Sequence, residues 1–357
     1  MDYLENWDQI KARYEALWEN EIVDRCCISV YAMKKDAVRK EFPYPKDEKS
    51  QMAYRTDPHL INERFIESEK NVYYAGDAIP ITTLGLGTNA YSTQFGCTPL
   101  FDENTVWFTE VIEDWDNDKL IYNPNDAYTE LYLKSLKELR FLAGNKYFVS
   151  MADNTSALDA LAQIRGTQNL MMDLICEPER VKQATKILTD AWLATNERQF
   201  KILKETNQEG SCICWLSTWA PGKHSQIQCD LSVMISPEQF NEFALEELTR
   251  AADSLDNALY HFDGIEQTRH LGSLLSIKNI KMIQWTNVPG QTPVTKNFDT
   301  LRRIQAAGKG LLLHLSPGQV EEVLENLSSR GLYIVTGANS EEEADHIVKM
   351  ASKLTRE

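Results

Sequence analysis

Two side chains that can bind a metal or carry a proton, His261 and Asp263, stand at the end of a mostly apolar stretch, residues 257–264 (NALYHFDG). Residues two apart on an extended chain point to the same side, so both side chains can reach one ligand. The apolar residues predict a buried strand, and in a barrel of parallel strands the strand ends are where chemistry takes place. The alternative interpretation is a core histidine followed by an Asp-Gly turn, and the motif alone favours neither.

Further polar and aromatic residues stand at the ends of other predicted strands. Several of them together are typical of a pocket with aromatic walls and a few polar groups, although core packing is the alternative for the tryptophans and a buried backbone contact for the histidine. The candidate substrate-binding residues are Tyr31, Asp153, Trp215, Trp219, Trp285, Asn287 and His314.

Eight strand candidates position these residues. They begin near residues 27, 78, 147, 211, 258, 280, 311 and 332, and from the third onward each is followed by a helical pattern. This alternation predicts an α/β fold, a single (β/α)8 TIM barrel that takes in the whole chain, 1–357. A doubly wound open sheet remains an alternative, but it usually carries a Gly-rich turn after its first strand, which is absent here.

Two additions to the barrel are expected. Apolar residues at helical spacing, among them Trp7, Ile10 and Tyr14, predict an N-terminal helical cap within residues 1–25. Residues 91–128 are rich in aromatic residues, Asp and Asn, and show no obvious helix. Because a long irregular segment in a compact domain is usually functional, we interpret this segment as an insertion over the barrel mouth.

The composition limits the class of protein. A net charge of −16, without any Lys/Arg-rich run, disfavours binding to nucleic acid or to an anionic membrane. No apolar run reaches the length of a membrane span and no signal peptide is readable, so we expect a soluble, cytoplasmic protein. The seven cysteines include no CxxC pair and are interpreted as reduced thiols.

Three segments carry a family resemblance: 158–166 (LDALAQIRG), 230–240 (DLSVMISPEQF) and 260–264 (YHFDG). Together they resemble the uroporphyrinogen decarboxylase superfamily, which includes methyltransferases that move methyl groups to or from corrinoids. The resemblance extends over roughly residues 75 to 355 and implies an eight-stranded α/β barrel. It also implies that Asp77, just before the apolar stretch 78–81, matches an Asp with which the decarboxylases contact their substrate, so we expect Asp77 to orient a substrate. The Arg-rich motif of the decarboxylases is missing, because residues 32–35 read AMKK, so haem-pathway decarboxylation is disfavoured.

The methyltransferase branch implies a zinc site with a His-x-Cys pair on the strand that matches residues 260–264. His261 matches, whereas Asp263 stands in place of the cysteine and residues 335–339 supply no further one. Zinc also accepts oxygen ligands, so His261, Asp263 and either Cys229 or Asp230 form an alternative ligand set. The resemblance also implies a corrinoid on a separate partner protein, since the chain has no readable cobalamin-binding module.

Three functions stay open. The first is a methyltransferase-like enzyme in which His261 and Asp263 bind zinc or act as acid and base while Asp77 orients a small substrate. The second is a metal-independent decarboxylase or lyase on a small organic acid, with Asp77 and His261 transferring protons. The third is a barrel that binds a ligand without turnover. A homodimer is expected as a further possibility.

Overall fold

A hydrogen-bonded sheet of seven strands forms the centre of the computed structural model, which describes residues 6–38 and 40–356. Its order is β2-β1-β13-β12-β11-β10-β9, and all neighbours are parallel except β1 and β2. The strands are β1 (Cys27–Met33), β2 (Val72–Gly76), β9 (His224–Ile227), β10 (Asn257–Phe262), β11 (Ile280–Trp285), β12 (Gly310–Leu315) and β13 (Leu332–Ala338). The predicted α/β class with a parallel sheet is therefore confirmed.

The remaining strands form three separate pairs. They are the parallel pair β3 (Ile81–Thr82) with β6 (Phe148–Val149), and the antiparallel pairs β4 (Pro99–Phe101) with β5 (Val106–Phe108) and β7 (Gly210–Ile213) with β8 (Thr218–Pro221). Among the described residues, strand pairing does not close the sheet into the predicted eight-stranded barrel. β9, which is not among the eight predicted strands, pairs with β10, while the strand predicted near residue 211 is β7 and pairs antiparallel with β8.

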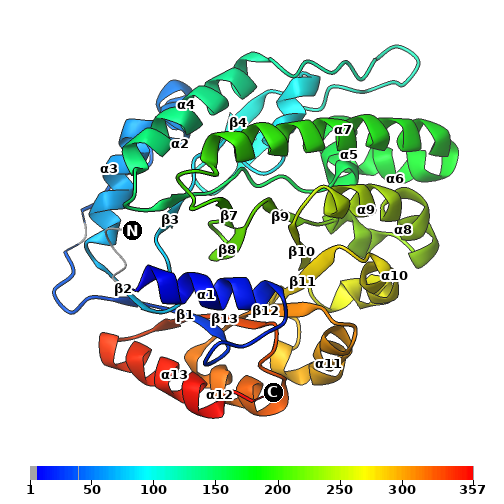
Figure 1. The fold of residues 1–357 in the computed structure, drawn as a ribbon. Coiled ribbons are helices and arrows are strands. Elements are labelled where there is room, and N and C mark those ends of the chain that lie inside the picture. Colours follow the sequence, from blue (N-terminus) through cyan, green and yellow to red (C-terminus); the bar gives the residue numbers. More distant parts are fainter. Residues whose placement is uncertain (1–5, 39, 357) are drawn as a thin grey trace.

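Helices surround the strands (Figure 1). In chain order they are α1 (Trp7–Trp18), α2 (Glu48–Thr56), α3 (Pro58–Glu69), η1 (Ala90–Phe95), α4 (Ala127–Ala143), α5 (Ala157–Arg165), α6 (Thr167–Cys176), α7 (Pro178–Leu203), η2 (Asp230–Met234), α8 (Pro237–Phe243), α9 (Leu245–Asp253), η3 (Ile265–His270), α10 (Leu271–Ser276), η4 (Val294–Lys296), α11 (Phe298–Ala306), η5 (Pro317–Gln319), α12 (Val320–Asn326) and α13 (Glu341–Leu354). Capping residues in the sequence determine where helices such as α13 begin. In α13 the Ser340 side chain accepts a hydrogen bond from the Glu343 backbone at 3.1 Å, which caps the first turn. Across the described residues, no helix combines the length and the apolar composition needed to cross a membrane.

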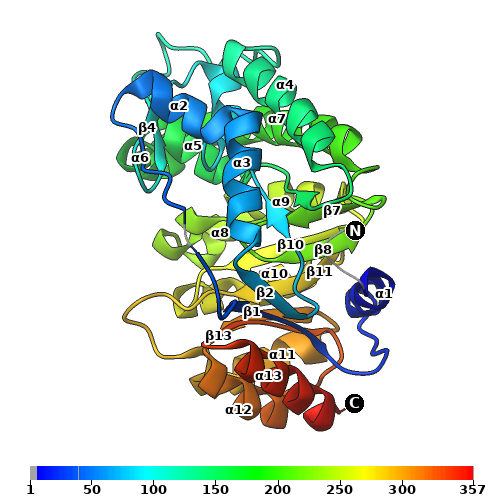
Figure 2. The same cartoon turned by 90° about the vertical axis from the view of Figure 1, so that its left-hand side faces the viewer.

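The predicted N-terminal helix is present as α1, while residues 1–5 lie outside the described part of the chain. It packs across the side of the sheet where the parallel strands begin, with the Trp7 ring 5.0 Å from Phe148 and 5.3 Å from Trp219. In Figure 2, α1 lies on one side of the strands, whereas α2 and β4, the latter within the predicted insertion, lie on the other. The strands therefore end on the side that faces α2 and β4, away from α1.

Alternating residues of the parallel strands face two different cores. Leu259, Met282 and Leu312 lie in an inner cluster with the aromatic residues of α1. Their sequence neighbours, such as Tyr260 and Ile283, lie in an outer cluster with the covering helices. Because side chains of a strand alternate between its faces, this division tells which residues of each strand can reach an inner site.

Candidate active site

His261 lies at the carboxyl end of β10 and has the same facing as Leu259, so its side chain points inward. Its Nδ1 is 2.5 Å from Oε1 of Gln284 and 3.1 Å from Oγ1 of Thr286. The Trp215 ring stands edge-on to the imidazole, with ring centroids 5.1 Å apart. Because the Gln284 oxygen can only accept, Nδ1 carries a proton, and the second nitrogen, Nε2, remains for a ligand or a transferable proton.

Gln284 and Gln226 are site residues that our sequence analysis missed. Gln226 lies on β9, and its Nε2 donates to Oδ1 of Asp153 at 2.5 Å. Both glutamines are buried, at 2% and 1% exposure. A buried amide inside an apolar strand is unusual, and this was the signal in the sequence that could have found them.

Carboxyl groups gather around His261. Asp153 accepts a second hydrogen bond from Oγ1 of Thr88 at 2.8 Å, and burial raises the pKa of its carboxyl. Burial of its carboxyl also raises the pKa of Asp230, although part of the residue is exposed to solvent. The nearby His261 opposes this rise. The charge of Asp263 also raises the pKa of Asp230, so Asp263 lies near the same carboxyl groups. Carboxyls with a raised pKa beside a histidine are suited to proton transfer.

The predicted tryptophans separate into one that borders the site and two that do not. Trp215, in the turn between β7 and β8, is 40% exposed and contacts His261. Trp285 is 2% exposed and packs at a tilt against Phe262 in the outer core, with ring centroids 5.2 Å apart. Trp219 is fully buried among the α1 residues, and its Nε1 donates to the backbone of Asn207. Trp285 and Trp219 are therefore packing residues.

The remaining substrate-binding candidates lie on β12, β1 and the loop after β11. His314 faces inward at the end of β12, burial lowers its pKa, and its Nε2 has no hydrogen-bond partner among the described residues. Asn287 donates to the backbone oxygen of His314 at 2.7 Å. Tyr31 lies on β1 with its ring 5.6 Å from Tyr74, and burial raises its pKa to about 12. The neutral imidazole of His314 can accept a proton or a hydrogen bond from a substrate.

Asp77 does not lie with His261. Its carboxyl is fully buried where β1 begins, and it accepts hydrogen bonds from the backbone of Ile28 and from Arg25 at 2.5 Å and Arg13 at 3.2 Å. The parallel strands end, and present His261, at the opposite side of the sheet. The structure therefore gives Asp77 a structural role in place of the expected orientation of substrate.

The expected zinc ligands are not brought together. Cys229 belongs to the outer core and is fully buried there, because it has the opposite facing to Gln226 and Gln228 on the same chain segment. Within residues 6–38 and 40–356, no three His, Cys, Asp or Glu side chains are grouped closely enough to hold one ion. Cys229 therefore does not fit a ligand set with His261 and Asp263.

Two open pockets lie beside the carboxyl groups of Asp153 and Asp230, near the ends of the parallel strands. One has a free volume of about 610 Å³ and is lined by residues that include Thr88, Trp107, Asp230 and Met234. The other has a free volume of about 310 Å³ and includes Thr88 and Asp153 in its lining. Each is large enough for a small organic molecule.

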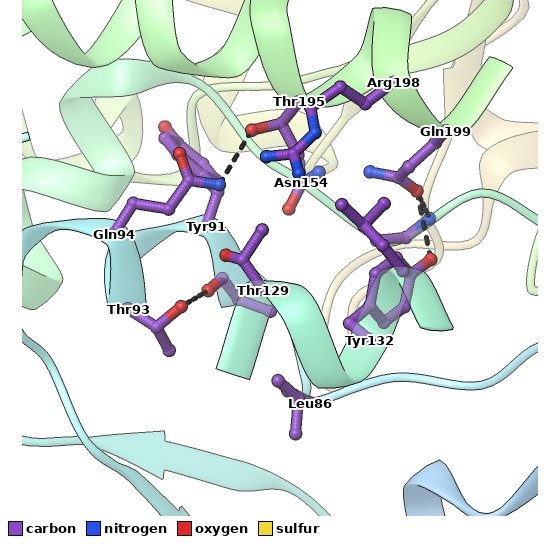
Figure 3. Close-up of a pocket in the computed structure, with 13 residues that line it drawn as sticks. Leu86, Tyr91, Thr93, Gln94, Thr129, Tyr132, Asn154, Thr195, Arg198 and Gln199 are labelled. Carbon is purple, nitrogen blue, oxygen red and sulfur yellow. Dashed lines mark hydrogen bonds between the residues drawn. The ribbon is translucent and has the colours of Figure 1, made fainter. Parts of the chain in front are cut away.

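A further, small cavity lies where Asn154 meets Tyr91, Gln94 and Gln199 (Figure 3); its free volume of about 20 Å³ holds about one water molecule. Side chains of η1, α4 and α7 line it, and the amides of Asn154, Gln94 and Gln199 each present at least one atom without a partner among the described residues. Buried amides of this kind are commonly satisfied by ordered water. The cavity is separate from His261, which does not line it.

No family model and no curated protein matches this sequence. Among solved structures, the chain is similar to a methyltransferase from Methanosarcina mazei, with a TM-score of 0.62 and 11% sequence identity. The likeness covers 96% of this chain and 98% of that chain. At this identity the likeness shows a shared fold along the whole chain, and the narrower superfamily remains a prediction.

Proposed function

We propose that this chain is a methyltransferase that moves a methyl group between a small substrate and a corrinoid held by a partner protein. The observation that carries the proposal is the position of His261, which is fixed through Nδ1 by Gln284 and lies beside the exposed Trp215. The shared fold with a methyltransferase along nearly the entire chain supports it.

The chemistry that His261 can supply is a proton at the substrate heteroatom. When the bond between the methyl carbon and the heteroatom breaks, the electron pair stays on the heteroatom, which then takes a proton from Nε2 of the imidazolium. In the reverse direction Nε2 accepts the proton as the heteroatom forms the bond. The carboxyls of Asp153 and Asp230 lie close enough to His261 to interact with it electrostatically.

The rim of the mouth suits a flat apolar cofactor presented by another protein. Trp107, Met234 and Leu100 are 65%, 49% and 47% exposed, and the first two line the pocket beside Asp230. Large apolar side chains grouped on a surface commonly mark an interaction site. The partner would reach His261 from this side.

The test uses cob(I)alamin as methyl acceptor with a panel of methylated thiols, amines and alcohols, and follows methylcobalamin by its absorption. We expect His261→Gln to slow transfer by about a hundredfold or more, because the proton donor is lost. His59→Gln, at an exposed histidine of α3, is the matched control and should transfer at the wild-type rate. A wild-type protein inactive with every substrate, or an unchanged rate in His261→Gln, would contradict the proposal.

A second candidate is metal-independent proton transfer on a small organic acid. It is favoured because no three His, Cys, Asp or Glu side chains of the described residues are close enough together to hold one metal ion. Elemental analysis and treatment with a chelator address this directly. We expect activity to survive the chelator, because the described residues offer no three-ligand site. Stoichiometric zinc that disappears in both His261→Gln and Asp263→Asn would instead support a metal-centred transferase.

A further inference from the structure

The smaller of the two open pockets, of about 310 Å³, differs from the rest of this acidic protein in its charge. Arg55 from α2 and Arg64 from α3 line it, together with Thr88 and Asp153. The chain as a whole carries a net charge of −16. Two guanidinium groups that share one pocket in such a chain point to an anionic ligand.

Arg64 is prepared for such a ligand. Its guanidinium carbon stands 3.6 Å from the centre of the Tyr54 ring, and the Tyr54 hydroxyl is held by the backbone oxygen of Phe42 at 3.0 Å. Stacking uses the flat face of a guanidinium and leaves its N–H groups at the edge for hydrogen bonds. No carboxylate forms an ion pair with Arg64 in the described part of the chain.

Arg55 has a different part in the pocket. Its Nη2 donates to the backbone oxygens of Asp102 at 2.6 Å and Thr105 at 3.2 Å, and its own backbone oxygen accepts from Gly85 at 3.1 Å. These bonds tie the β4–β5 hairpin and the glycine loop 85–87 to α2. Arg55 therefore shapes the pocket and adds positive charge, while Arg64 keeps its donors for a ligand.

The pocket extends toward the proposed catalytic residue. Asp153 lines it and interacts electrostatically with His261. A dianion such as phosphate would be repelled by the carboxyl of Asp153 and by the negative field of the chain, whereas a single carboxylate matches one guanidinium edge. We propose that Arg64 binds the carboxylate of a small methyl-bearing acid, so that the other end of the substrate lies beside Asp153 and His261. This inference rests on the proposed function, for which it names the substrate class.

The test measures binding and does not require turnover. Methylthiopropanoate and its amide, methylthiopropanamide, are titrated into the full chain and observed by ligand NMR. We expect the wild type to bind the acid more tightly than the amide. Arg64→Gln should weaken binding of the acid by about ten- to a hundredfold, which is the effect of losing a charge-assisted hydrogen bond. The affinity for the amide should stay the same.

Two further variants make the result specific. Arg64→Lys keeps the positive charge but loses the paired N–H donors of the guanidinium, so it should bind the acid with intermediate affinity. Arg302→Gln removes the same charge from the exposed surface of α11 and should bind the acid as the wild type does. Equal binding of acid and amide by the wild type, or an unchanged affinity in Arg64→Gln, would overturn the inference.

Inorganic phosphate and acetate, added as competitors, separate the two kinds of anion. Acetate should displace the acid more effectively than phosphate, and the opposite order would overturn the assignment to a carboxylate. If the acid binds through Arg64 but no methyl group reaches cob(I)alamin, the carboxylate site stands while the proposed methyl transfer fails.

Discussion

Asp77→Asn is expected to lower the free energy of unfolding by about 3–5 kcal/mol, the usual effect of removing one partner from a buried ion pair. The substitution keeps the size of the side chain but leaves Arg25, which is 5% exposed, without its carboxylate. Arg13 also loses its second acidic partner, 3.2 Å away. Urea unfolding followed by tryptophan fluorescence measures the change.

Asp24→Asn is the matched control, since Asp24 pairs with the same Arg13 at 2.6 Å but is 53% exposed. An exposed ion pair contributes within about 1 kcal/mol, so this variant should unfold close to the wild type. If Asp77→Asn were as stable as the wild type and lost only methyl transfer, the carboxyl would have the catalytic role that the sequence suggested.

The position of His261 could be predicted because it depends only on local pattern. An apolar strand that ends in His-x-Asp exposes those side chains at the strand end in any parallel barrel, whichever strands lie beside it. The facing of Trp285 could not be predicted, because it depends on the register of β11. In the structure His261 pairs with Gln284 and Phe262 with Trp285, so the glutamine faces the site and the tryptophan faces the helices.

Cys229 and Asp77 were misplaced for two different reasons. Cys229 is next to Gln228 in the chain, and a shift of one residue would have exchanged their faces. Asp77 was assigned to the site through the family resemblance, next to a strand expected from residue 78, but the strand in that region is only β3, Ile81–Thr82. Long-range pairing with Arg25 and Arg13 fixed the position of Asp77, and a single sequence holds no local signal for it.

Glu69 leads to the second large effect, a change of stability with pH. The residue ends α3 and is only 6% exposed, and its carboxyl accepts a hydrogen bond from the Tyr74 hydroxyl. Burial raises the pKa of Glu69 to about 7, although Tyr74 and Lys34 oppose the rise. No acid–base step proposed for His261 uses this group.

The folded protein therefore holds a proton on Glu69 that the unfolded chain releases above a pH of about 4.5. The protonated Glu69 contributes its full amount to the free energy of unfolding below that pH, and this contribution is lost as the pH rises to about 7. The loss amounts to about 3 kcal/mol, from 1.36 kcal/mol for each pKa unit. Glu69→Gln stays neutral and can still accept from Tyr74, so its stability should not fall in this range.

Urea unfolding at pH 5 and pH 8 measures the effect as the difference between Glu69→Gln and the wild type, so that groups titrating in both proteins cancel. We expect Glu69→Gln to be the more stable protein at pH 8 and the two to be similar at pH 5. Glu67→Gln is the matched control on the same helix, because Lys70 lowers the pKa of the Glu67 carboxyl at the surface. Parallel pH profiles for Glu69→Gln and the wild type would show that Glu69 is ionised in the folded protein at neutral pH, and that Tyr74 and Lys34 outweigh its burial.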